Sequence, residues 1–245
     1  MKCEKIATRS LLFTFDDIGM PTNVFAINGS RSIYMIDTYL GPEVMKLVHE
    51  ETKRVFGDKP VIVVNTHWHW DHIWGNCYFD SAIIAHDNCY KYIKSGAAEK
   101  LNKFRKYVMG EVDIVCPNIT FSDKLIFRED GLELFYTPGH TDDCISVFDM
   151  EDKVLYAGDN LERPLPYIYH SDLKTYVNTL EAYLKLGSKY VIGGHTSCES
   201  DELISDNLDY IRGVYSGADM EFTADEYKET HEANMESLKS LLKGE

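Results

Sequence analysis

The stretch His67-Trp68-His69-Trp70-Asp71-His72 places four potential metal ligands within six residues, directly after the apolar run 61–64. A short, continuous apolar run predicts a strand that is buried on both faces. Imidazole nitrogens suit zinc, and a carboxylate adds a harder oxygen ligand. Alternate side chains of an extended segment point to the same side, so both histidines of the His-x-His step can approach one metal. The turn that follows can then direct Asp71 and His72 towards a second metal nearby.

Three further loops each place one potential ligand directly after a predicted strand. Each loop contains glycine, which lets the backbone turn sharply and approach a ligand closely. Rigid scaffolds commonly present their chemistry on loops at strand ends. Each loop is weak evidence alone, but together with the first stretch the three predict one shared metal site. They provide His140 after strand 132–136, Asp159 after strand 154–157 and His195 after strand 190–192.

The rest of the chain alternates predicted strands and helices, as in an α/β protein. Asn28-Gly29 provides turn chemistry for a hairpin between strands 22–28 and 32–37. Proline and glycine at its two ends delimit a predicted helix at 42–56. The expected buried stripe of this helix consists of Val44, Leu47, Val48 and Val55. Further strands are predicted at 83–85, 124–127 and 145–149, and further helices at 97–108, 172–186, 201–215 and 224–243.

The composition limits the class of partner. The chain has 245 residues with 40 acidic and 25 basic side chains, giving a formal net charge of −15. An acidic surface repels phosphate backbones and anionic lipid, which disfavours nucleic acid and membranes as partners. The apolar stretch 11–15 is too short for a signal peptide, and no segment approaches the roughly 20 apolar residues of a membrane span. We therefore expect a cytoplasmic protein that acts on a small molecule, and the sequence indicates no oligomeric state.

The ligand pattern resembles that of the metallo-β-lactamase superfamily, whose signature is His-x-His-x-Asp-His followed by a lone His, a lone Asp and a final His. All seven positions match, and the resemblance extends over roughly residues 20–200, including Asp37 at the end of the predicted hairpin. It implies a four-layer αβ/βα sandwich with the metals at one edge between two sheets. We expect residues 1–245 to form a single domain of this kind, with C-terminal helices at about 201–243.

The resemblance also implies roles for these residues in a hydrolase. His67, His69 and His140 would hold one metal, while Asp71, His72 and His195 would hold a second and Asp159 would bridge both. The expected metals are two zinc ions, with iron or manganese as alternatives. A hydroxide shared by the two metals would attack an ester, thioester or lactone of a small molecule. Asp71 is the expected catalytic residue, because it can orient the nucleophile or move a proton while it binds its metal.

Other branches of the superfamily fit less well. Lactamases that destroy antibiotics commonly have a cysteine in place of Asp159 or an arginine in place of His72, and the flavodiiron branch replaces the histidine at His69 with glutamate. A persulfide dioxygenase-like oxidoreductase with a single iron shares almost the same ligands and stays open as the alternative. A metal-binding protein without catalysis is a third reading. Among hydrolases, both a glyoxalase II-like thioesterase and a lactonase stay open.

Aromatic residues near the ligands are candidates for the pocket wall. Tyr167 and Tyr169 follow Asp159 in an irregular segment, and a phenol there could donate a hydrogen bond to a substrate oxyanion, as a tyrosine does in the lactonase branch. The alternative for both is packing, since the chain has 16 tyrosines. Trp68, Trp70 and Trp74 are expected either to line the pocket or to belong to the core.

Overall fold

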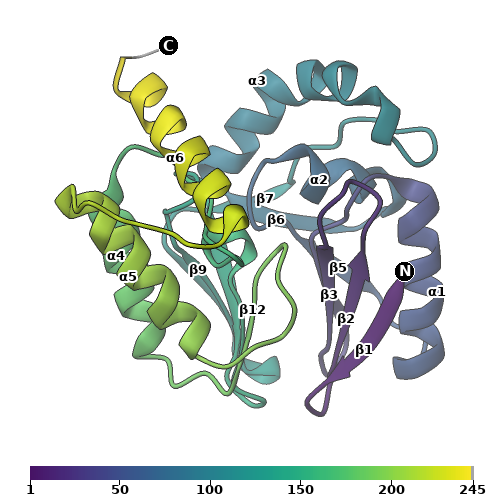
Figure 1. Cartoon of the computed structure of the whole chain (residues 1–245). Coiled ribbons are helices and arrows are strands. Elements are labelled where there is room, and N and C mark those ends of the chain that lie inside the picture. The colour runs from purple at the N-terminus through teal and green to yellow at the C-terminus, as the bar shows by residue number, and fades with distance from the viewer. Residues whose placement is uncertain (244–245) are drawn as a thin grey trace.

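Two β-sheets pack face to face in the computed structural model, which describes residues 1–243 (Figure 1). The first sheet has seven strands in chain order, antiparallel from β1 to β4 and parallel from β4 to β7. These strands are β1 (Lys2–Ile6), β2 (Ser10–Phe15), β3 (Thr22–Asn28), β4 (Ile33–Ile36), β5 (Val61–Val64), β6 (Ala82–His86) and β7 (Ile119–Phe121).

The second sheet has five strands in the order β12-β11-β10-β9-β8. All neighbours pair antiparallel except β11 and β12, which are parallel. The strands are β8 (Lys124–Phe127), β9 (Leu132–Tyr136), β10 (Ile145–Asp149), β11 (Val154–Tyr156) and β12 (Tyr190–Ile192). Short 3₁₀ turns lie at Trp74–Tyr78, Arg105–Tyr107, Arg128–Asp130 and Gly158–Asn160.

Helices cover the outer faces of both sheets. Helices α1 and α3 pack on the first sheet, and α4, α5 and α6 pack on the second (Figure 1). The predicted four-layer αβ/βα sandwich is therefore confirmed. The helices are α1 (Pro42–Phe56), α2 (Trp70–Ile73), α3 (Asp87–Lys103), α4 (Leu173–Leu184), α5 (Glu202–Ser216) and α6 (Asp225–Lys243). Within residues 1–243, no helix combines the length and the apolar character that crossing a membrane requires.

Strand β3 shows why the sequences of the central strands are continuous apolar runs. Val24 and Ala26 belong to the core beneath helices α1 and α3, whereas Phe25 and Ile27 belong to the core between the sheets. Side chains alternate between the faces of a strand, so a strand covered on both sides needs apolar residues at every position. Phe25 stacks on Tyr156 of the opposite sheet with ring centroids 5.5 Å apart. Each such buried side chain contributes roughly 1.5–3 kcal/mol.

Parallel pairing brings functional loops to one edge of the sandwich. Strands β4 and β5 are parallel, so Asp37 and Thr66 emerge side by side at their carboxyl ends. Strands β11 and β12 are also parallel, which places the loops carrying Asp159 and His195 next to each other. The two sheets thus present their loops to the same region.

Helix α1 has the predicted bounds, but its buried stripe differs from the prediction. Val44 and Val48 are buried, whereas Leu47 and Val55 are 52% and 38% exposed. Met45 and Thr52 are buried instead, so the buried face of the helix is formed by positions 44, 45, 48 and 52.

The predicted helix at 97–108 is wrong at both ends. Helix α3 begins at Asp87 and ends at Lys103, and His86 caps its start by accepting a hydrogen bond from Asn88 N–H at 3.1 Å. Strands β1, β2 and β7 were also absent from the sequence-based expectation. β1 and β7 are edge strands whose residues are mostly exposed, so no burial pattern marks them, whereas β2 is buried and its apolar run at 11–15 is short.

A buried ion pair joins the two sheets at the edge opposite helix α6. Arg9, in the turn between β1 and β2, donates to both carboxylate oxygens of Asp149 at 2.8 and 2.6 Å. It also donates to the Asp130 carbonyl at 2.7 Å. The Asp149 side chain is fully buried and that of Arg9 is 12% exposed, so the pair is shielded from solvent.

We expect Arg9→Met to destabilise the fold by about 2–3 kcal/mol, because it leaves the buried Asp149 carboxylate without its cation. This value is lower than for a fully buried pair because Arg9 is partly exposed to solvent. Urea unfolding of the variant and the wild type measures it. Arg212→Met is the control, because Arg212 pairs with Glu181 at the exposed surface and its loss should leave stability unchanged. Equal effects of the two substitutions would contradict the structural role of Arg9.

Candidate metal centre

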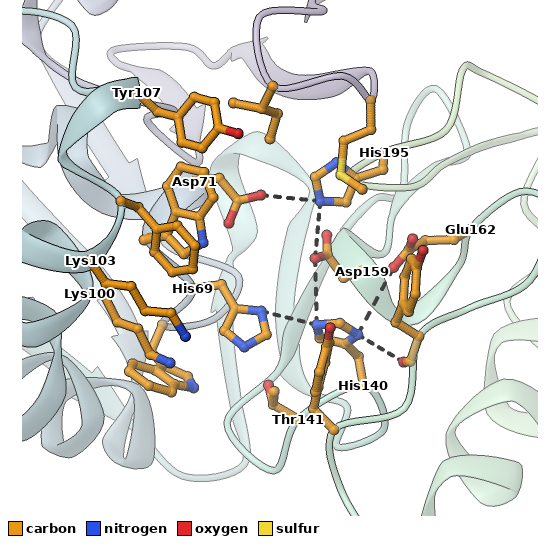
Figure 2. A pocket seen from close by; sticks show the side chains of 17 residues that line it. His69, Asp71, Lys100, Lys103, Tyr107, His140, Thr141, Asp159, Glu162 and His195 are labelled. Atoms are coloured by element: carbon orange, nitrogen blue, oxygen red, sulfur yellow. Dashed lines mark hydrogen bonds and ion pairs between the residues drawn. The ribbon is translucent and has the colours of Figure 1, made fainter. Parts of the chain in front are cut away.

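The structure brings all seven predicted ligand residues together where the loops of the two sheets meet. Figure 2 shows those that line the neighbouring cavity, namely His69, Asp71, His140, Asp159 and His195. They form two adjacent groups, and within each group one ligand atom per residue lies within 4.8 Å of the others. All are buried except His69, which is half-buried. The first group contains His67, His69, His140 and Asp159, and the second contains Asp71, His72 and His195.

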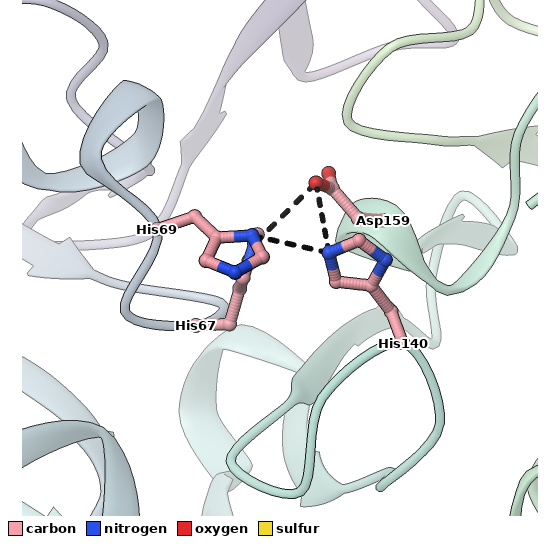
Figure 3. Close-up of side chains that lie close together, drawn as sticks. All are labelled: His67, His69, His140 and Asp159. Carbon is pink, nitrogen blue, oxygen red and sulfur yellow. Dashed lines mark hydrogen bonds and ion pairs between the residues drawn. The ribbon is translucent and has the colours of Figure 1, made fainter. Parts of the chain in front are cut away.

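Asp159 lies between the two groups. Its Oδ2 is 3.4 Å from His67 Nε2 and 3.6 Å from His140 Nε2, as the view of the first group shows (Figure 3). The same oxygen lies 3.3 Å from His195 Nε2, and Oδ1 lies 3.3 Å from His72 Nε2, both in the second group. One carboxylate therefore faces ligand atoms of both groups.

The spacing and the unpaired atoms fit divalent metals. His67 Nε2 and His72 Nε2 are buried and have no hydrogen-bond partner among the described residues. Tetrahedral ligands at about 2.1 Å from a zinc ion lie about 3.4 Å from one another. The contacts here run from 3.1 Å, between His69 Nδ1 and His140 Nε2, to 3.6 Å. The donor set of imidazoles and carboxylates also suits such ions.

The second nitrogen of several histidines is fixed by a hydrogen bond. His140 Nδ1 donates to the Tyr167 carbonyl at 2.9 Å, and His195 Nδ1 donates to the Pro21 carbonyl at 2.8 Å. A carbonyl oxygen can only accept, so Nδ1 carries the hydrogen and Nε2 keeps a lone pair for a metal. These bonds also hold each ring in its orientation.

Asp37 orients one histidine of each group. Its Oδ2 accepts from His72 Nδ1 at 2.9 Å and from the Thr66 hydroxyl at 2.8 Å, while Oδ1 accepts from Thr66 N–H at 2.8 Å. Because the Thr66 hydroxyl donates to Asp37, its oxygen can accept from His67 Nδ1 at 3.0 Å. A single fully buried carboxylate thereby positions His67 and His72 at once.

Two glycines make room for the centre. A Cβ on Gly194 would overlap Asp159 Oδ1 and lie 3.0 Å from His72 Cε1. Gly158 has a φ of +55°, a conformation that favours glycine, and this turn directs the next residue, Asp159, into the site. The glycines of the Gly-Asp and Gly-Gly-His loops therefore serve close approach, as the sequence predicts.

Buried charges strongly bias protonation in the metal-free protein. Although burial opposes it, the carboxylate of Asp159 raises the pKa of both His72 and His195 well above the ordinary value. Burial likewise opposes the shift of Asp159, yet the neighbouring histidines, His72 first, hold its pKa well below the usual range. Burial lowers the pKa of His140 to about 4. Without a metal ion, the positive charge of protonated His72 and His195 thus compensates the negative charge of the carboxylates, a role that a bound cation would otherwise fill.

A cavity of about 640 Å³ opens onto the centre (Figure 2). Tyr167 and Tyr169 both line it, and the ring of Tyr169 meets that of His140 edge-on at 5.1 Å. Trp68 and Trp70 also line the cavity. Trp74 is only 1% exposed and belongs to the core beneath helix α1, so it is not a wall residue.

Several site residues were not predicted from the sequence. Glu162 lines the cavity with a buried carboxyl group whose Oε1 has no hydrogen-bond partner among the described residues. Burial, and then the charge of Asp159, raise the pKa of Glu162 to about 8. Lys100 and Lys103 line the opposite wall. Their signal in the sequence was a pair of like charges three residues apart, within a basic segment of an acidic chain.

Comparison with known proteins agrees with this geometry. Residues 17–195 match the family model described as the metallo-beta-lactamase superfamily. Because the match covers most of the chain and includes all seven ligand positions, the chain belongs to this superfamily and is a metal-dependent hydrolase.

Individual relatives are more distant. The human acyl-coenzyme A thioesterase MBLAC2 is 26% identical over 202 residues, which cover 70% of each chain. The hydroxyacylglutathione hydrolase of Bartonella tribocorum is 27% identical over 166 residues, covering 67% of this chain and 59% of that protein. The crystal structure of the DIM-1 metallo-beta-lactamase superposes with a TM-score of 0.71 at 18% identity, over 87% of this chain and 97% of that one. At that identity the last comparison supports the fold alone.

We expect Asp37→Asn to lower zinc affinity by about 10–100-fold, because the amide cannot accept from both Thr66 and His72 as the carboxylate does. Competition with a chromophoric chelator measures the affinity. Asp130→Asn is a matched control, since Asp130 is also a buried acceptor, from the Tyr34 hydroxyl at 2.6 Å, outside the site. Equal zinc affinity of the two variants would contradict the positioning role.

Metal binding at neutral pH should release protons. His72 and His195 have raised pKa values in the metal-free protein and hold protons there, whereas a metal binds only the neutral ring. Metal affinity should therefore rise with pH. Calorimetric titration with zinc in buffers of different ionisation enthalpy counts the released protons. An affinity that stays constant between about pH 6 and about pH 8 would be evidence against this charge balance.

Proposed function

We propose that the chain is a zinc hydrolase with two metal ions, and that it cleaves thioesters of small molecules within a broader capacity for esters and lactones. The observation that carries the proposal is the position of Asp159 between two ligand groups. The first group offers three histidines and the second offers Asp71 with two histidines, so each can hold its own ion with Asp159 shared. A single iron, as in a persulfide dioxygenase, would leave one complete group unused.

The relatives support a thioester as the substrate bond. Both the human thioesterase and the Bartonella hydrolase are named for the hydrolysis of thioesters, one of coenzyme A and the other of glutathione. The cavity beside the centre has room for a small molecule, and its wall is partly aromatic and partly charged. The thioester is therefore the proposed bond.

The residues divide the chemistry between them. When bound, the metals supply a Lewis acid that lowers the pKa of a water molecule and polarises the substrate carbonyl. Asp71 lines the cavity as a carboxylate, since neighbouring His72 and His195 hold its pKa low despite burial, and it would accept the proton of the attacking water. A hydroxyl of Tyr167 or Tyr169 would donate to the oxygen that gains charge as the carbonyl is attacked.

The C-terminal helix supports the segment that carries these tyrosines. Asn234 of α6 is buried, accepts from Ile168 N–H at 2.9 Å and donates to the Pro166 carbonyl at 2.9 Å. The helix therefore holds the backbone on both sides of Tyr167. On this basis we propose that residues 1–245 act as one domain, of which the last two residues lie outside the described part.

Zinc titration of metal-free protein should restore thioester hydrolysis with saturation at two ions per chain. Asp159→Asn should lower turnover by at least about a thousandfold, because both metals lose their shared ligand. The measurement combines metal analysis with release of free thiol from an acetyl thioester.

Asp172→Asn serves as the control for this substitution. Asp172 caps helix α4 by accepting from Thr175 N–H at 3.0 Å, a role that asparagine fills equally well. The proposal fails if turnover persists without metal, or if the active protein holds one iron per chain and consumes oxygen with a persulfide.

A further inference from the structure

The segment that faces the metal centre from helix α3 is basic in an acidic chain. Between residues 87 and 107 there are six basic and two acidic side chains, although the whole chain has a net charge of −15. A charged helix surface is ordinarily a solvated face with carboxylates interspersed among the cations. This segment departs from that pattern, and two of its cations, the half-buried Lys100 and the exposed Lys103, line the cavity.

The two lysines share one face of α3, since residues three apart on a helix are neighbours. Both side chains reach from the helix towards the cavity (Figure 2). Within the described chain, neither ammonium has a carboxylate at ion-pair distance, as for most of its lysines, and each lies over an aromatic ring, Trp68 for Lys100 and Phe104 for Lys103. Two adjacent cations without a counter-ion repel each other, and an anion bound between them would remove that repulsion.

The lysines are linked to the metal centre by an aromatic wall. The Nζ atom of Lys100 lies over the ring of Trp68, 5.4 Å from its centroid, and Trp68 stands between two of the proposed ligands in sequence. Phe104 stacks on Trp70 with ring centroids 4.6 Å apart, next to Lys103. A ligand whose reactive carbonyl lies at the metals would therefore pass along an apolar surface before it reaches the lysines.

The side of the cavity opposite α3 adjoins a mainly acidic hollow. This hollow has a volume of about 540 Å³ and shares Glu162 with the cavity, and its lining also includes Glu199, Glu226 and Glu229 beside one basic residue, Arg163. A negatively charged group would be repelled from that side and attracted to α3. The cavity is thus polarised across its width, which favours one orientation of an anionic ligand.

We propose that Lys100 and Lys103 form a docking site for an anionic group of the substrate, a phosphate or a carboxylate, that lies remote from the bond being cleaved. The inference rests on the proposed thioester hydrolysis and specifies its substrate class as thioesters of an anionic thiol. An ammonium group binds phosphate or carboxylate oxygen as a compact point charge with several rotatable donors. The aromatic wall contacts the linking part of the thiol.

The test compares three acetyl thioesters that differ only in the thiol. Coenzyme A carries phosphates, glutathione carries carboxylates, and N-acetylcysteamine is uncharged. The zinc-loaded chain should cleave at least one charged thioester with a higher kcat/KM than the neutral one. In wild-type protein this advantage should shrink as salt is added, because ions screen exposed charges.

Lys100→Met and Lys103→Met keep the length of the side chain and remove its charge. Each should lower kcat/KM for the preferred charged thioester about tenfold, mainly through a higher KM, and leave the neutral thioester unchanged. Lys94→Met is the matched control, because Lys94 is an exposed lysine of the same helix whose ammonium interacts with Tyr90 and does not line the cavity. Whether the coenzyme A or the glutathione compound loses more identifies phosphate or carboxylate as the bound group.

A binding measurement separates this inference from the proposed function. Calorimetry with S-methyl-coenzyme A and S-methylglutathione, whose sulfur is blocked, reports docking without hydrolysis. Lysine-dependent binding with no thioester hydrolysis would overturn the proposed function alone. Thioester hydrolysis with binding that is equal in wild type and both variants would overturn the docking site alone. A loss that is equally large for the neutral thioester would also overturn it, since the lysines would then act on the fold or on the chemistry.

Discussion

The buried carboxylate of Asp37 is the interaction on which the rest of the site depends. It has no exposure to solvent, and it accepts hydrogen bonds from Thr66 and His72. A charge in such a place is stable only when donors surround it. Those donors come from the loop directly after β5 and from α2, so the hydrogen bonds of one carboxylate fix where the His-x-His-x-Asp-His segment leaves the sheet. Through Thr66 and His72, the same carboxylate fixes one imidazole ring in each of the two ligand groups.

The centre also couples folding to metal. Asp71 and Asp159 bring negative charge into a region that histidines alone can balance only by taking up protons. The sheets, however, hold these residues from four separate strand ends, far apart in sequence. The two sheets therefore place the ligands, and a bound cation would balance the negative charge of these carboxylates.

Much of this arrangement was predictable because its signals are local. The apolar run before His67 and the glycines before His140, Asp159 and His195 mark strand ends and close turns within a few residues. The four-layer fold followed from the resemblance that those loops carry. Contacts between distant segments could not be predicted from such local patterns. Glu162 gives no pattern of its own, and helix α3 was misplaced because its polar first turns carry a weak apolar stripe and the glycine at Gly96 resembles a break. Edge strand β1, with mostly exposed residues, gave no burial signal either.

Helix α3 carries none of the seven ligand residues, yet it forms one wall of the cavity. The backbone that sets the metal geometry and the backbone that presents Lys100 and Lys103 are thus separate pieces of the chain. If the lysines dock the substrate as proposed, a substitution of either would change which molecules bind near the centre and leave the ligand residues in place. Under that proposal, a few substitutions on the surface of α3 would be enough to change substrate preference during evolution, with the ligand residues unchanged.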